Sequence, residues 1–139
     1  MASIRQQINI DAGLREVWNA LSTVDGWTSW YADDARVDAR KGGRITLSAI
    51  GDDGEPVDEV GIFLTFRPTR KLEVAWDATS PAPTKGTTLS FQVARDGDET
   101  RLALVHSGGG ILEDEDARDA LVKEWRQAFH ALRDHLESE

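Results

Sequence analysis

A histidine at position 106 is the side chain of this sequence best placed to do chemistry inside a fold. It lies in the run TRLALVHS, in which Leu102, Leu104 and His106 share one parity. Successive side chains of a strand point to opposite faces, so His106 should point inward with the two leucines. A neutral imidazole there could orient a polar group of a bound molecule. The alternative is a core histidine bonded to a backbone group, or one at the open end of the sheet.

Three glycines, Gly108 to Gly110, follow this strand and precede a helical pattern. Such an order could form a phosphate cradle, in which free N–H groups at a helix start hold an anion. Here the first helical turn, Glu113 to Asp116, is acidic and would repel phosphate, and no GxxxxGK motif occurs. We therefore interpret the glycines as a flexible turn that redirects the chain from the last strand onto a helix.

Neither a metal site nor a nucleophilic active site is predicted. His130 and His135 would be separated by about 140° on a helix, and no cysteine or HExxH motif accompanies them. The acidic stretch GDDGEPVDE lacks the glycine and glutamate positions of a calcium-binding loop. No GxSxG motif is present, and no base accompanies the hydroxyls and carboxylates. We expect no catalytic residue, no metal ligand and no cofactor.

Aromatic residues give a stronger signal for binding. Five tryptophans are many for a chain of 139 residues, although most aromatics at alternating or helical positions are simply core. A pocket with aromatic walls and a few polar groups suits a small apolar ligand. The predicted ligand-binding residues are Trp30, Trp76, Phe91, His106, Trp125 and Phe129.

Helical and strand periodicities alternate along the chain in an order that would position these residues. IRQQINI predicts a first strand, residues 12–22 an amphipathic helix, and DGWTSWYADD a second helix or loop, with Gly26 interrupting the first helix. Short turns, such as the one at Asp96 and Gly97, predict antiparallel neighbours. The period-2 segments are RVDAR, RITLSAI, VGIFLTF, KLEVAWD, TTLSFQVA and TRLALVHS.

The last segment, EDEDARDALVKEWRQAFHALRDHLE, predicts a long helix. It has no internal Gly or Pro, its first turn is acidic, and one broad stripe is apolar. The apolar face of a sheet must be covered by another apolar surface. The stripe on this helix is the long apolar surface that the sequence offers. The expected fold class is α+β, with two short helices and a long C-terminal helix packed across a curved antiparallel sheet. We predict a single domain over residues 1–139.

Composition excludes several partners. The formal charge of −9 would repel a nucleic-acid backbone, so no nucleic-acid binding is expected. The start MASIRQQINID lacks the features of a signal peptide, and no stretch approaches the length of a membrane span. The absence of cysteine leaves the redox compartment undetermined. We expect a cytoplasmic protein without a membrane span.

Five segments in order carry a family resemblance: REVWNALSTVDGWTSWY, KGGR, FRPTRKLEVAW, TRLALVHSG and EWRQAFHALRDHLE. Together they resemble the bacterial homologues of the activator of the heat-shock-protein-90 ATPase, in the START-like (SRPBCC) superfamily with its helix-grip fold. The likeness covers nearly all of residues 4–137. It implies a cavity between the sheet and the long helix, with Trp27, Trp30 and Tyr31 matching the family's Trp-rich segment. Glu124 departs from the glycine often found before Trp125, and we expect it to turn outward or to pair.

The leading hypothesis is therefore a protein that binds a small hydrophobic or amphipathic molecule between the sheet and the terminal helix. A cyclase- or hydratase-like enzyme on the same fold is an alternative, with His106 as the inward acid or base. A co-chaperone-like activator of a chaperone ATPase is another, which the resemblance invites. A chaperone and a second copy of the chain both stay open as partners.

Overall fold

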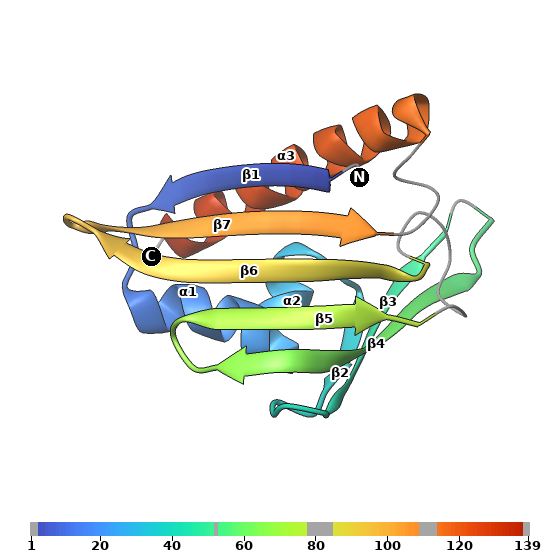
Figure 1. The fold of residues 1–139 in the computed structure, drawn as a ribbon, viewed down its shortest axis with the longest axis horizontal. Helices are drawn as coiled ribbons and strands as arrows, with labels where there is room; N and C mark the ends of the chain where they lie inside the picture. The colour runs from blue at the N-terminus through green and yellow to red at the C-terminus, as the bar shows by residue number, and fades with distance from the viewer. Residues whose placement is uncertain (1–2, 52, 78–84, 109–113, 138–139) are drawn as a thin grey trace.

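The computed structural model describes residues 3–51, 53–77, 85–108 and 114–137, which form one sheet covered on one face by helices (Figure 1). The N-terminal part holds β1 (Ser3–Ile10), α1 (Leu14–Ser22), α2 (Val24–Trp30) and β2 (Asp34–Val37). The central strands are β3 (Arg44–Ile50), β4 (Pro56–Arg67) and β5 (Lys71–Trp76). The chain continues through β6 (Thr87–Asp96) and β7 (Glu99–Gly108) to α3 (Glu115–Glu137).

The sheet has seven antiparallel strands in the order β1-β7-β6-β5-β4-β3-β2. Strands β2 to β7 therefore form the predicted meander, and β1 adds to its far edge by pairing Ser3 with Ser107 and Ile10 with Thr100. The predicted turn after Asp96 is tight, and Gly97 adopts a left-handed φ of 62° there. The prediction of an antiparallel sheet is confirmed.

Alternation along the strands sets which face is buried. On β7, Leu102, Leu104 and His106 are fully buried, while the residues between them are partly exposed. On β5, Leu72, Val74 and Trp76 are buried in the same way. The prediction that His106 points inward with the leucines is therefore confirmed.

The first helix ends at Ser22, as the sequence predicted, but the residue that separates it from α2 is Thr23 and not the predicted Gly26. The Thr23 side chain caps α2 by accepting a hydrogen bond from the Gly26 N–H. Gly26 lies inside α2, where a Cβ atom would stand 2.1 Å from the carbonyl oxygen of Asn19 on α1. The glycine therefore serves close packing of the two helices, and it does not break one of them.

The long helix α3 lies across the covered face beside β1 (Figure 1). Its buried side chains are Leu121, Trp125, Phe129 and Leu132, which are the members of the predicted stripe nearest the sheet. The Gln6 side chain on β1 donates to the Val122 carbonyl and ties the helix to that edge. Gly108 ends β7 with a φ of 81°, and the rest of the predicted glycine turn lies outside the described residues.

Candidate ligand-binding interior

The six predicted ligand-binding residues all lie in the interior between the sheet and the helices. None is more than 8 % exposed. The Phe91 ring on β6 contacts Trp125 and Phe129 of α3 at centroid distances of 6.0 and 6.5 Å, and Trp30 of α2 contacts Phe129 at 6.5 Å. Two further aromatics, Trp27 and Tyr31, complete this cluster, which the predicted site did not include.

His106 is held by two side chains. The Trp125 indole N–H donates to His106 Nδ1 at 3.2 Å, so the proton of the neutral ring is on Nε2. Nε2 lies 2.7 Å from the Thr87 hydroxyl, to which it donates. Burial lowers the pKa of His106 to about 4, which keeps the imidazole neutral at physiological pH. The histidine is thus a buried core residue, but its partners are side chains and not the expected backbone groups.

Trp76 differs from Trp27, Trp30 and Trp125 in its indole N–H. Trp27 and Trp30 donate to the backbone carbonyls of Leu21 and Ala20, at 2.8 and 2.9 Å. Trp76 is 4 % exposed, and its Nε1 has no hydrogen-bond partner among the described residues. Buried polar groups in folded proteins are nearly always paired, so this donor is an exception that calls for an explanation.

Four neighbouring strands place hydrogen-bonding side chains on the inner face at the same end of the sheet. Gly61 on β4 pairs with Trp76 on β5, and Leu89 on β6 pairs with His106 on β7. Because side chains two residues apart share a face, these pairings put four polar groups in a row across the strands. We call this row the polar band: Glu59 (β4), Trp76 (β5), Thr87 (β6) and His106 (β7).

Tyr31 joins the polar band to the helices. Its hydroxyl donates to Glu59 Oε1 at 3.1 Å, and its ring stacks on Trp125 with centroids 5.4 Å apart. Burial first, and then the Glu59 carboxylate, raise the pKa of Tyr31 well above its ordinary value. Tyr31 is therefore a hydrogen-bond donor at any physiological pH. The adjacent Glu124 is exposed, as expected for its outward orientation.

Beyond the polar band the inner face becomes accessible to solvent. Glu59 is partly exposed, and the next inner residue of β4, Val57, is 39 % exposed. Its neighbour Ala49 on β3, paired with it in register, is exposed as well. The inner face of the sheet is therefore uncovered at the end formed by β3 and β4.

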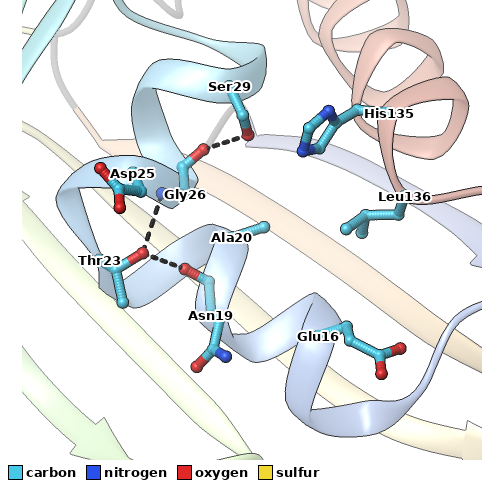
Figure 2. Close-up of a pocket in the computed structure, with 9 residues that line it drawn as sticks. All are labelled: Glu16, Asn19, Ala20, Thr23, Asp25, Gly26, Ser29, His135 and Leu136. Atoms are coloured by element: carbon cyan, nitrogen blue, oxygen red, sulfur yellow. Dashed lines mark hydrogen bonds between the residues drawn. The ribbon is translucent and has the colours of Figure 1, made fainter. Parts of the chain in front are cut away.

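A separate hollow of about 460 Å³ lies between α1, α2 and the C-terminal end of α3 (Figure 2). Ser29 and Thr23 on its wall already bond to the backbone: they donate to the carbonyls of Gly26 and Asn19. None of the six predicted residues lines this hollow. Its hydroxyl groups serve helix packing, so we take the interior as the candidate site.

Two absences hold for the described ranges. Within residues 3–51, 53–77, 85–108 and 114–137, no helix is long and apolar enough to cross a membrane. Over the same ranges, no three His, Cys, Asp or Glu side chains are grouped so that they could hold a metal ion.

An antiparallel sheet clasped by a long C-terminal helix, with two short helices at its start, is the α+β helix-grip fold. The chain belongs to the family of Activator of Hsp90 ATPase homolog 1-like proteins, whose model matches residues 11–137. The resemblance seen in the sequence is thereby confirmed. No curated protein is similar enough to count as a match.

Solved structures of similar fold come from several bacteria. The Aha1 dimer from Colwellia psychrerythraea has a TM-score of 0.82 and 23 % identity, and the alignment covers 99 % of this chain and 97 % of that one. The AHSA1-like protein from Aeromonas hydrophila has a TM-score of 0.79 and 19 % identity, with 98 % and 92 % covered. CalU16 from Micromonospora echinospora has a TM-score of 0.74 and 24 % identity, with 96 % and 75 % covered. At these identities the likeness concerns the fold alone.

Proposed function

We propose that this protein binds a small, largely apolar molecule between the inner face of the sheet and α3. The observation that carries the proposal is the buried Trp76 N–H, which has no partner among the described residues and lies in the polar band. An unmade hydrogen bond of this kind costs about 1–3 kcal/mol. A ligand with an acceptor at this position would recover that free energy on binding.

The surrounding side chains supply the apolar part of the proposed site. Trp30, Phe91, Trp125 and Phe129 form its aromatic wall, and their rings already contact one another. His106 accepts from the Trp125 indole and so fixes the orientation of that ring. The ligand would enter over the accessible inner face of β3 and β4 and lie against these rings, with its acceptor towards Trp76.

Tryptophan fluorescence tests this proposal, because a ligand on these rings changes their emission. We expect at least one member of a panel of small aromatic and lipid molecules to shift the emission and raise the melting temperature. Trp76→Phe keeps a ring but removes the donor, and should weaken binding about tenfold. Trp27→Phe, whose N–H is already used by the backbone, is the matched control and should keep the affinity. A panel that changes neither emission nor melting temperature would refute ligand binding.

Family membership favours a second candidate, in which the partner is a protein. The family's description names an activator of the Hsp90 ATPase. We propose testing this chain against the chaperone by pull-down and by ATPase assay, where an activator would raise the turnover rate. The Colwellia protein is described as a dimer, so sedimentation should accompany the assay to reveal a second copy of the chain.

A further inference from the structure

One edge of the sheet lies beside an open cleft. Strand β1 is an edge strand, because it pairs with β7 alone in the strand order. Helix α3 passes behind β1 and extends beyond this edge of the sheet (Figure 1). A cleft of about 380 Å³ lies between the two elements. It is lined by residues 6–8 of β1 and by Arg126, Phe129, His130 and Arg133 of α3.

The turn between β6 and β7 indicates how the backbone groups of β1 are directed. Asp96 pairs with Glu99 across a two-residue turn, and the residues that close such a turn exchange both backbone hydrogen bonds. Counted from Glu99, every second residue of β7 therefore bonds to β6, and the residues between them bond to β1. In the observed register their partners are the even-numbered residues of β1.

The odd-numbered residues of β1 direct their backbone N–H and C=O groups to the open edge: Arg5, Gln7 and Asn9. Outside the strand pairings, no backbone–backbone hydrogen bond among the described residues uses these groups. Unpaired groups at a sheet edge are a template for another strand. The edge at β1 can therefore accept an extended chain.

The polar side chains that α3 contributes to the cleft are basic. Arg126 and Arg133 are seven residues apart, which brings them to nearly the same face of the helix. Arg133 donates to His130 Nδ1 at 3.0 Å. Neither arginine belongs to an ion pair found among the described residues, and two further cations, Lys123 and Arg5, are exposed nearby. We call the cleft lined by residues 6–8 and these α3 side chains the basic cleft.

The acidic residues of α3 around the basic cleft do not line it. Asp134 is rotated about 100° from Arg133 around the helix. Glu137 accepts a hydrogen bond from a backbone N–H between β1 and α1. Asp119 precedes Arg126 by seven residues, a rise of roughly 10 Å. The charge contributed by the lining side chains is therefore positive, in a chain of formal charge −9.

Two carboxylates of the sheet lie beside β1, those of Asp96 and Glu99. Both accept from the Asn9 side chain at the far end of the strand, and Asp96 also pairs with Arg101. Neither carboxylate lines the basic cleft. They therefore leave the positive charge beside the middle of β1 in place.

We propose that β1 is a docking edge for an acidic, extended segment of another protein, which adds to the sheet as a further strand and places alternate carboxylates in the basic cleft. Backbone hydrogen bonds supply affinity, and the arginines supply specificity. A second copy of the chain that paired through its own β1 would bring two basic clefts together, so the charge disfavours that partner. The ligand site proposed above plays no part in this inference.

Peptides as long as β1, 8 residues, serve as probes. One alternates glutamate with threonine, and its control alternates glutamine with threonine. Fluorescence anisotropy of the labelled peptides, titrated with the full chain near pH 7 at low ionic strength, gives each dissociation constant. We expect the glutamate peptide to bind about tenfold more tightly, because several ion pairs form at once.

Backbone N-methylation of the glutamate peptide tests strand addition separately from charge. Two versions carry methyl groups on alternate nitrogens, one version for each parity. Only one parity of an added strand directs its N–H groups to β1. One version should therefore lose at least about tenfold in affinity, and the other should stay within about threefold of the unmethylated peptide.

Variants of the protein test its own side of the contact. Arg126→Gln combined with Arg133→Gln should reduce the preference for glutamate to within about threefold. Arg15→Gln combined with Arg36→Gln is the matched control, because it removes two exposed cations on α1 and β2, and it should leave the preference within about twofold.

Gln7→Pro removes a backbone N–H of the open edge without touching the pairing with β7. It should weaken the glutamate peptide about tenfold. Thermal unfolding checks that each variant is folded, and the methylated peptides test the same point if Gln7→Pro is not.

Several results would overturn the proposal. Equal binding of the glutamate and glutamine peptides would remove the charge selection, and equal binding of both methylated versions would remove strand addition. Binding of no peptide would refute the docking edge itself. Self-association of the chain in sedimentation that Gln7→Pro abolishes would assign the edge to a second copy instead.

Discussion

The two ends of the inner face are built from the same strands but satisfy their polar atoms differently. At the end near α1, the inner residues Leu72, Val93 and Leu102 are apolar and buried. Even Thr100 there is paired, because its hydroxyl donates to the Ala12 carbonyl at 2.7 Å. At the other end the polar band relies on side-chain partners, and the Trp76 N–H has none among the described residues.

This difference separates a region that maintains the fold from the region where we propose that a ligand binds. The apolar end gains stability from close packing alone, so it has nothing to offer a ligand. The polar end keeps a desolvated donor and a partly buried carboxylate next to an accessible stretch of β3 and β4. Residues that break local rules of stability tend to be functional, and this criterion supports our proposal that the ligand binds at the polar end.

The largest effect should come from a cavity at the apolar end. Leu102→Ala removes a fully buried side chain on β7 and should lower the free energy of unfolding by about 2–5 kcal/mol. Urea denaturation measures the change. A loss below about 1 kcal/mol would contradict the view that this end is the packed core.

At the polar end, His106 should make stability depend on pH. Its pKa is about 4 in the folded protein against 6.5 when unfolded, so the unfolded chain binds the proton first as the pH falls. The contribution of His106 to the free energy of unfolding is complete above pH 6.5 and is lost as the pH falls from 6.5 to about 4. At pH 5 the loss should be roughly 2 kcal/mol.

A variant that does not titrate isolates this effect. His106→Gln can accept from Trp125 and donate to Thr87 as the imidazole does. Denaturation of both proteins at pH 7.5 and pH 5 gives the difference. Equal pH dependence in the two proteins would mean that His106 is not the responsible group.

A pair of tryptophan variants compares a satisfied indole with an unsatisfied one. Trp27→Phe breaks a hydrogen bond to the Leu21 carbonyl, whereas Trp76→Phe removes a donor without a partner among the described residues. Trp27→Phe should therefore lower the free energy of unfolding by about 1–3 kcal/mol more than Trp76→Phe does. Thermal or urea unfolding of both variants checks the order. Equal losses would indicate that Trp76 has a partner.

The smallest effect should come from the bond between α2 and the polar band. Tyr31→Phe removes the hydroxyl that donates to Glu59 and keeps the ring that stacks on Trp125. We expect a loss of about 0.5–1.5 kcal/mol. A much larger loss, measured by denaturation, would assign Tyr31 a structural role beyond this hydrogen bond.

Alternation and helical periodicity predicted the features that depend on local sequence. The inward parity of Trp76, Phe91 and His106, and the stripe of α3 with Trp125 and Phe129, follow from patterns of a few residues each. Local patterns do not determine how closely side chains from different elements approach one another. The order of the elements favoured contact between these side chains but did not give the distances. The binding role of the six residues stays a prediction.

The residues that the sequence interpretation missed lie where a pattern was interrupted. The predicted strand began at Val60, because Gly, Asp and Pro before it indicated a turn, and this left Glu59 outside. The strand in fact begins at Pro56, and the inner parity of Glu59 with Gly61 and Phe63 could have revealed it. A shift of register between Phe63 and Thr65 then changes the alternation, which no local pattern shows.

The pairing of β1 with β7 has a consequence during protein synthesis. Ser3 lies beside Ser107, so the first strand emerges from the ribosome roughly 100 residues before the strand that completes it. At translation speeds of about 5–20 residues per second the wait is on the order of 5–20 s. For that time the isoleucines of the first strand lack their partners in the sheet, and this edge of the fold forms only after β7 has been synthesised.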